Sequence, residues 1–150
     1  MKIINPATER VIKSIQTDDS ASIEQKHHLA IEAVMAFQKY TIAERLEVVR
    51  KFSALLETNL ERLAALLTSE MGKPIQQSRN EIAGARSRIN FFLENSERIL
   101  EDKIVYQEEG FNEIIKYEPL GVIANISAWN YPYLVGVNVF VTAVIAGNSV

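Results

Sequence analysis

The fold is decided by the end of the chain, GVIANISAWNYPYLVGVNVFVTAVIAGNSV, residues 121–150. Residues 121–126 form a short apolar run, which is typical of a strand in a buried parallel sheet. Residues 127–132 predict a turn. The apolar content of residues 133–146 predicts a helix, although their β-branched side chains are poor helix formers. A Gly-Asn pair then ends this helix, and the last two residues begin another strand. A strand, a helix and a strand in this order open a parallel α/β unit.

This end of the chain carries no charge, since all 16 basic and 19 acidic residues lie at or before Glu118. A chain terminus normally lies at the surface. The uncharged end therefore predicts either a membrane span or a core segment whose packing partners lie beyond residue 150. A span needs about 20 predominantly apolar residues, and this run is interrupted by Asn125, Asn130, Pro132 and Asn138. The interruptions favour the core segment, so the chain is predicted to be the front of a longer subunit.

Composition places the chain among ordinary globular proteins. Its 150 residues are 47% apolar and 23% charged, which fits one domain and excludes intrinsic disorder. A net charge of −3 without a basic block argues against a nucleic-acid partner. The absence of Cys excludes a disulfide, a thiolate metal site and a thiol nucleophile within these residues. Pro6 comes too early for the apolar core of a secretion signal, so a cytoplasmic location is expected.

The first two predicted helices each combine a cap with an apolar stripe. Ser20 or Ser22 can cap the first helix, and Thr41 and Glu44 form a capping box at the start of the second. The two stripes are Ile23, Ala30, Val34 and Phe37, and then Leu46, Val49, Phe52 and Leu56. Because these residues recur at helical spacing, each helix is predicted to have one apolar face.

Two further helices are predicted before residue 101. Asn59 can cap the third, and Gly72 and Pro74 end it, because Gly supplies a left-handed cap and Pro cannot continue a helix. The fourth is predicted over residues 75–100. Its inward residues are Ile82, Ile89, Phe92 and Leu93.

A hairpin is predicted after Lys103, where the apolar period changes from helical to alternating. Residues 104–107 and 112–118 are its expected strands, and Glu108-Glu109-Gly110 is its turn. The carboxylates of this turn are most simply solvated. No repeat, low-complexity segment or domain linker is visible.

The turn at residues 127–132 is the part of the sequence most suited to chemistry. It places Trp129 and Asn130 where a buried strand delivers the chain to a helix, and ligands of open α/β sheets bind outside the carboxyl ends of strands. The residue pattern alone favours a structural role. Asn is a preferred helix cap and Pro132 suits a first turn, so Asn130 would cap the helix and Trp129 would pack.

Other chemistry is not indicated. His27 and His28 are adjacent on a predicted helix and so point about 100° apart, which favours solvated residues over a metal site. The six glycines match neither the G-x-G-x-x-G fingerprint nor a phosphate-binding P-loop. A nucleotide would have to be held in another way.

Several motifs, in order along the whole chain, resemble the aldehyde dehydrogenase superfamily. They are Asn5-Pro-Ala-Thr8, Glu70-Met-Gly-Lys-Pro74, Glu118-Pro-Leu-Gly-Val-Ile123, Trp129-Asn-Tyr-Pro132 and Ala146-Gly-Asn-Ser-Val150. The short N-terminus and the form of the second motif are most similar to the succinate-semialdehyde dehydrogenase branch. One departure is Ala128, where the family usually has Pro.

The resemblance implies an α/β fold that is an incomplete aldehyde dehydrogenase. Residues 1–102 and 119–150 would be the N-terminal part of a Rossmann-like NAD(P)-binding domain, with N-terminal helices and the opening β-α-β of its parallel sheet. Residues 103–118 would be the hairpin of an oligomerisation arm. The catalytic domain would be absent from these residues.

The resemblance also implies an activity. In the family a Cys attacks the aldehyde, hydride passes to NAD or NADP, and a Glu-activated water releases the acid. Asn130 matches the Asn whose amide stabilises the oxyanion. The expected cofactor-binding residues are Ile126, Ser127, Ala128, Trp129 and Asn130.

The expected partners follow from the same resemblance. They are a small aldehyde such as succinate semialdehyde, and either further copies of the chain or the missing C-terminal part. No nucleic acid, membrane or metal is expected. The catalytic Cys, the Glu base and the Lys that holds the ribose would lie beyond residue 150, so the chain alone is predicted to be inactive. The alternative is a non-catalytic fragment that acts as an assembly module through its hairpin.

Overall fold

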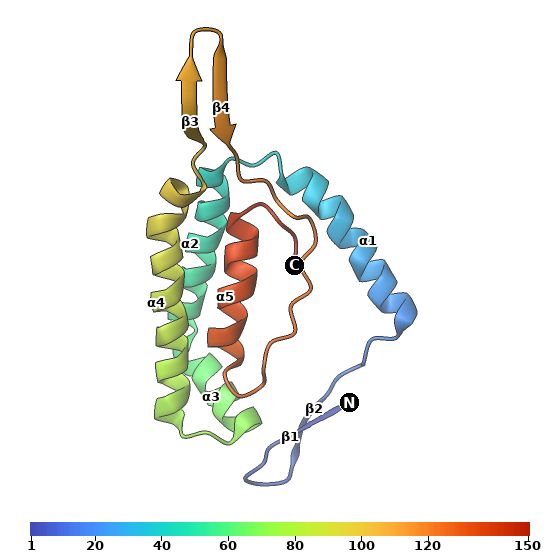
Figure 1. The fold of residues 1–150 in the computed structure, drawn as a ribbon. Coiled ribbons are helices and arrows are strands. Elements are labelled where there is room, and N and C mark those ends of the chain that lie inside the picture. The colour runs from blue at the N-terminus through green and yellow to red at the C-terminus, as the bar shows by residue number, and fades with distance from the viewer.

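The computed structural model describes residues 1–150 and contains five helices and four short strands. Their order is β1 (Lys2–Ile4), β2 (Val11–Ser14), α1 (Ser20–Phe37), α2 (Ile42–Thr58), α3 (Leu60–Met71), α4 (Ile75–Leu100), β3 (Lys103–Glu108), β4 (Phe111–Ile115) and α5 (Pro132–Ile145). Figure 1 shows α2, α4 and α5 side by side, with α3 at one end of the group. All the predicted helices are present, and the one over residues 75–100 has the predicted bounds.

The core lies where α2, α4 and α5 meet. Its residues recur at helical spacing on each helix, so one face of each helix is apolar. They are Leu46, Val49 and Leu56 of α2, Ile82, Ala85 and Ile89 of α4, and Val137, Val141 and Ile145 of α5, together with Ala64 of α3. Full burial of one such large side chain contributes about 1.5–3 kcal/mol. The uncharged end of the chain therefore supplies one side of the core.

The capping box that opens α2 is confirmed. The Thr41 N–H donates to Glu44 Oε2 at 2.8 Å, and the Glu44 N–H donates to Thr41 Oγ1 at 3.3 Å. The backbone and hydroxyl hydrogen bonds from Thr41 lower the pKa of the Glu44 carboxyl below its ordinary value.

Two other predicted caps are wrong. Asp19, not Ser20 or Ser22, caps α1, because its carboxylate accepts the Ser22 N–H at 2.8 Å while the Ser22 hydroxyl accepts the Asp19 N–H. Asn59 stands at the start of α3 but donates its side-chain amide to Leu55 O at 2.9 Å. It is the single residue between α2 and α3, and its amide is used to close the helix before it.

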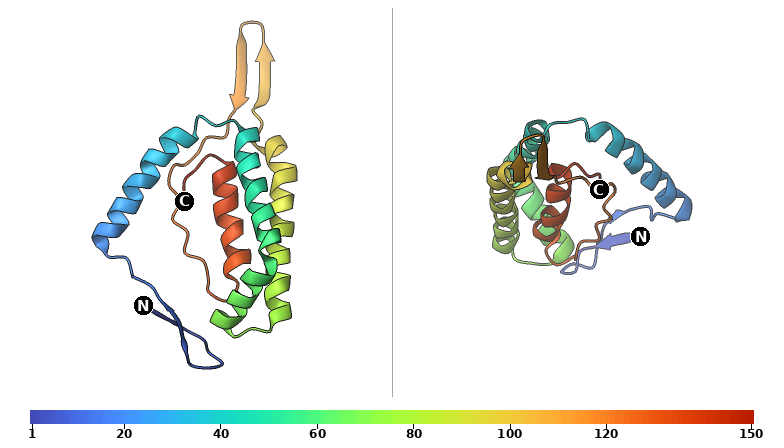
Figure 2. Two further views of the ribbon diagram at one scale, coloured as in Figure 1. Left: turned by 180° about the vertical axis from the view of Figure 1, so that it is seen from behind. Right: turned by 45° about the horizontal axis from the view of Figure 1, so that its top comes forward.

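Helix α1 lies apart from the other helices, as the two views of Figure 2 show. Of the predicted stripe, Val34 is buried and Ala30 and Phe37 are half-buried, but Ile23 is exposed. The Ser149 hydroxyl donates to Ala30 O at 2.7 Å and ties α1 to the end of the chain. A helical stripe is buried only where another element covers it, and α2 to α5 cover little of this one.

The predicted hairpin is confirmed and projects from one end of the helices (Figure 1). Strands β3 and β4 pair antiparallel around Gly110, whose positive φ of 83° suits glycine. The second strand ends at Ile115 rather than at residue 118. Every residue of the two strands is exposed.

The predicted strand over residues 121–126 forms only in part. Val122 and Ser149 make a single parallel bridge, with the Ile123 N–H donating to Ser149 O at 2.9 Å and the Ser149 N–H to Gly121 O at 3.0 Å. A parallel ladder extends only as far as its neighbour, and here the neighbour is the two-residue segment 149–150. The strand, helix and parallel strand order is nevertheless the predicted one.

No helix combines the length and the apolarity that crossing a membrane requires.

Candidate functional site

The predicted site residues lie consecutively on the loop that joins the partial strand to α5. We call residues 126–131 the Trp129 loop. Ile126 is 98% exposed and Trp129 is 76% exposed. Ala128 and Asn130 are also exposed, and Ser127 is half-buried. The loop therefore presents an apolar side chain, an aromatic ring and an amide together at the carboxyl end of the partial strand.

The Asn130 side chain has no role in the fold of these residues. It makes no hydrogen bond within the chain, and the residue at the start of α5 is Tyr131, which makes no side-chain cap bond. The interpretation of Asn130 as a helix cap is therefore wrong. The interpretation of Trp129 as a packing residue is also wrong within this chain, because its ring is mostly exposed.

Glu81 of α4 caps α5 instead. Its Oε1 accepts the Tyr133 N–H at 2.9 Å and the Leu134 N–H at 3.4 Å. The Glu81 side chain is completely buried. The first N–H groups of a helix have no partner within it and carry partial positive charge. A carboxylate placed there makes charge-assisted hydrogen bonds, which a neutral asparagine cannot match.

Lys73 completes this arrangement from the short turn between α3 and α4. Its Nζ donates to Glu81 Oε2 at 2.6 Å and to Asn130 O at 2.7 Å. The ammonium also lies over the Tyr131 ring, 4.0 Å from its centre. Gly72, with a φ of 73°, permits the turn, and a Cβ there would lie 2.8 Å from Pro6 Cγ. We call the Lys73–Glu81 pair and its bond to Asn130 O the brace.

The C-terminal end of α5 is bound by a positively charged side chain. Arg45 of α2 donates from Nη1 to Ile145 O at 2.9 Å, which suits the negative end of a helix. Burial lowers the pKa of the Arg45 guanidinium. Burial, followed by the charges of Glu70 and Glu81, raises the pKa of the Tyr133 phenol at the start of α5. Two charged side chains from different helices thus fix the helix that follows the site loop.

Glu81 and Lys73 are the two functional residues that sequence reasoning missed. Lys73 lies in a motif that resembles the family, but no role followed from its position. Glu81 is an acidic residue on the apolar face of α4, next to Ser78, Ile82 and Ala85, which are all fully buried. An acid in such a stripe usually has a partner, because burying an unpaired charge is costly. An acidic residue within the apolar stripe of α4 is therefore the sequence signal that could have identified Glu81.

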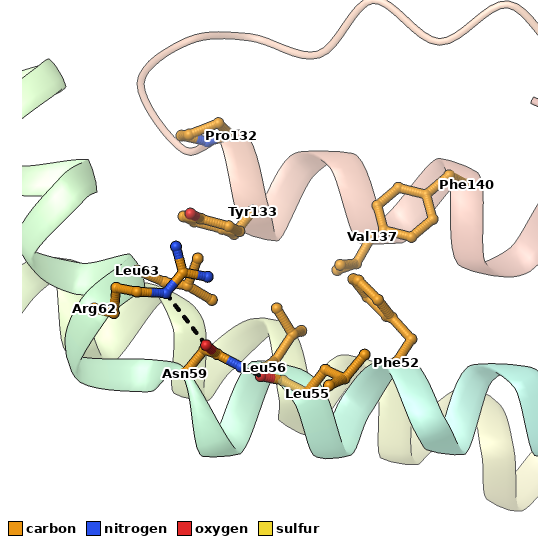
Figure 3. Close-up of a pocket in the computed structure, with 10 residues that line it drawn as sticks. All are labelled: Phe52, Leu55, Leu56, Asn59, Arg62, Leu63, Pro132, Tyr133, Val137 and Phe140. Carbon is orange, nitrogen blue, oxygen red and sulfur yellow. Dashed lines mark hydrogen bonds between the residues drawn. The ribbon is translucent and has the colours of Figure 1, made fainter. Parts of the chain in front are cut away.

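A mostly apolar pocket of about 560 Å³ lies between α2, α3 and α5 (Figure 3). Its polar groups are at one end, where Arg62 Nε donates to Asn59 Oδ1 at 3.2 Å. At the other end Phe52 and Phe140 meet edge to face. Pro132 and Tyr133 line it, but no residue of the Trp129 loop does. Since it holds no nucleophile and no carboxylate, this pocket suits packing more than catalysis.

The two histidines lie on the exposed face of α1. His28 Nε2 is 3.7 Å from Glu32 Oε1, and both side chains are mostly exposed. No three His, Asp or Glu side chains lie close enough together to hold a metal ion.

The whole chain, residues 1–150, matches the model of the Aldehyde dehydrogenase family. It is 35% identical over 132 residues to the glutarate-semialdehyde dehydrogenase of Pseudomonas putida, covering 88% of this chain and 28% of that enzyme. It is 32% identical over 145 residues to a probable NADP(+) succinate-semialdehyde dehydrogenase of Synechocystis, covering 97% and 32%. Part of the structure of an NADP-dependent enzyme of E. coli matches this chain with a TM-score of 0.91 at 27% identity, covering 98% of this chain and 31% of that one. The chain thus spans 28–32% of the length of these proteins.

Proposed function

Because the chain belongs to the aldehyde dehydrogenase family, we propose that it supplies one wall of the active site of an NAD(P)-dependent enzyme that oxidises an aldehyde to a carboxylic acid. The motif resemblance to the family is confirmed, and the fold is an incomplete version of that of the related structures. Residues 1–102 and 119–150 would belong to the cofactor-binding domain, and residues 103–118 to an oligomerisation arm. The thiol nucleophile would come from outside these residues, which contain no Cys.

The observation that carries the proposal is the state of Asn130. Its side-chain amide is exposed and makes no hydrogen bond within the chain, while its backbone is held by Lys73. An amide donor fixed in advance can stabilise negative charge that develops on an oxygen, and it does so without reorganising. We propose that Asn130 donates to the aldehyde oxygen as the thiol adds to the carbonyl carbon.

The rest of the loop suits the nicotinamide half of the cofactor. Ile126, Ser127, Ala128 and Trp129 are uncharged, and the first and last of them expose apolar surface that a flat ring can cover. When bound, NAD or NADP accepts a hydride from the substrate carbon. These residues would bind and orient the ring beside Asn130 and exclude water from it. The phosphates and the ribose would be held elsewhere.

The proposed substrate is a short semialdehyde, with succinate semialdehyde as the first candidate. Two of the relatives are named for the oxidation of glutarate semialdehyde and succinate semialdehyde. The Trp129 loop itself contains no cationic side chain that could select a second carboxylate. Selection among aldehydes would therefore depend on residues outside this chain.

Residues 1–150 can replace the matching segment of the Pseudomonas putida glutarate-semialdehyde dehydrogenase to give a chimera. We expect this chimera to be active. The assay follows NAD(P)H formation with glutarate or succinate semialdehyde, and the isolated chain is assayed in the same way for comparison. The isolated chain should give none, because it lacks a nucleophile. A chimera that has the circular dichroism and thermal midpoint of its parent but oxidises no aldehyde would contradict the proposal.

An assembly role has one specific observation in its favour. The hairpin of β3 and β4 is fully exposed and carries large apolar side chains, including Ile104, Phe111 and Ile115. Apolar patches beyond a few hundred Å² usually mark contact surfaces. The hairpin would then join copies of the chain, with or without catalysis.

We expect the isolated chain to be associated at micromolar concentration. The exposed hairpin, the Trp129 loop and the open side of the core all offer apolar surface to a neighbour. Light scattering measures the molar mass directly. Ile104→Lys and Ile115→Lys should shift the mass toward the monomer, while Lys26→Met, on α1, should not. A monomeric wild-type chain would refute this prediction.

A further inference from the structure

We propose that Lys73 is a positioning residue for the reaction, and that it acts by holding the backbone of Asn130 through the brace. The inference rests on the proposed function of Asn130. It assigns to Lys73 neither contact with substrate nor a share in proton transfer. Its role is to fix the direction from which the Asn130 amide meets the aldehyde oxygen.

The Lys73 ammonium contacts a buried carboxylate and the Trp129 loop at the same time. Lysine has three N–H donors, and two of them have partners here: Glu81 Oε2 at 2.6 Å and Asn130 O at 2.7 Å. The Tyr131 ring lies against the same ammonium. The brace thus holds the carbonyl of the peptide bond that links Asn130 to Tyr131. The orientation of that peptide sets the direction in which the Asn130 side chain leaves the backbone.

The Trp129 loop has few other attachments to the rest of the chain. Lys73 makes the only hydrogen bond to residues 126–131 from a residue distant in the chain. The other two bonds join near neighbours: Ser127 Oγ donates to Asn125 Oδ1 at 3.2 Å, and the Val135 N–H of the first turn of α5 donates to Tyr131 O at 2.9 Å. A loop with two exposed large side chains and one bond to a distant residue depends on that bond for its position.

The ion pair of the brace is more deeply buried than the other ion pairs of the chain. The Lys73 and Glu81 side chains are 11% and 0% exposed, whereas those of Lys26 and Asp18 are 67% and 45% exposed. Removing two charges from water costs about as much as their attraction returns, so a buried pair is weak evidence for stability. The brace therefore has a stronger physical rationale as a device for position than as a source of stability.

The test uses Trp129, which is the only Trp in the chain. Time-resolved fluorescence anisotropy of the isolated chain, recorded at a dilution at which light scattering gives the monomer, reports the squared order parameter of the nanosecond motion of Trp129, and no catalytic activity is needed. Three variants are compared with the wild type. Lys73→Met removes the ammonium, Lys73→Met/Glu81→Gln also removes the unpaired carboxylate but keeps an oxygen for the Tyr133 N–H, and Lys26→Met is the matched control on α1.

We expect the wild type and Lys26→Met to give the same order parameter and both Lys73 variants to give a clearly lower one, because nanosecond motion of the loop adds to that of the ring. The double variant should regain the thermal midpoint that Lys73→Met loses, because no buried charge is left unpaired, but it should not regain the order parameter. A double variant as rigid as the wild type would overturn the proposal. So would a wild-type loop that is already mobile.

The active chimera gives a second readout. There, the double variant should lower kcat by about 10²-fold, which is the usual cost of a misplacement of about 1 Å, while the KM for the aldehyde stays within about threefold of its value. Unchanged kcat would overturn the positioning role. A chimera that is inactive before any substitution would count against the proposed function alone, because the order parameters still decide whether Lys73 positions the loop.

Discussion

Asn130→Ala should lower the kcat of the active chimera by about 10²–10³, which corresponds to about 2.7–4 kcal/mol of transition-state stabilisation. The interaction strengthens as the aldehyde oxygen gains charge, so the substitution acts on the transition state more than on bound substrate. The KM for the cofactor should change little, since the amide donates to the substrate. Steady-state kinetics with saturating aldehyde and cofactor measure both quantities.

Asn90→Ala is the matched control for this substitution. Asn90 is exposed on α4 and, like Asn130, makes no side-chain hydrogen bond within the chain. The kcat of the Asn90→Ala chimera should equal that of the unmodified chimera. An equal loss in the two variants would show that the effect of Asn130→Ala does not come from the site.

Glu81→Ala should lower the free energy of unfolding by about 3–5 kcal/mol, because removing one partner of a buried ion pair leaves the other charge uncompensated. It also leaves the first N–H groups of α5 without an acceptor. For a domain of this size the thermal midpoint should fall by about 6–20 °C. Thermal unfolding followed by circular dichroism at neutral pH makes the measurement.

The matched control is Glu61→Ala, which removes a carboxylate from an exposed pair with Arg79. Exposed pairs contribute little because water screens them, so the midpoint should stay close to that of the wild type. If Glu81→Ala costs no more than Glu61→Ala, the brace does not hold α5 in place.

The local features of this fold could be predicted from sequence because they depend on neighbouring residues. The capping box of Thr41 and Glu44 and the stop at Gly72 are set within a few positions, and both were predicted. The cap of α1 was assigned wrongly because adjacent residues could each do the same task and only the packed backbone selects one. The Asn59 side chain does not cap α3 because its amide donates to Leu55 O at the end of α2. The extent of the partial strand at Val122 could not be predicted from neighbouring residues, since a parallel ladder depends on a segment distant in the chain.

The candidate site divides in the same way. Its loop was located from the order of strand, turn and helix, and the structure places the five predicted residues together because they are consecutive. The groups that hold the loop could not be found so easily. Lys73 and Asn130 are 57 positions apart in the chain. The assignment of Asn130 as a cap failed because Glu81, from another helix, takes the α5 amides first.

The most direct test of the account is to measure kcat and the thermal midpoint on one sample of the Asn130→Ala chimera. The side chain is exposed and unbonded within this chain, so we expect the midpoint to stay within about 2 °C of that of the unmodified chimera, while kcat falls by about 10²–10³. If Asn130 had a structural role instead, the substitution would lower the midpoint and leave kcat nearly unchanged. A lowered midpoint with unchanged turnover would contradict the claim that Asn130 stabilises the reacting oxygen.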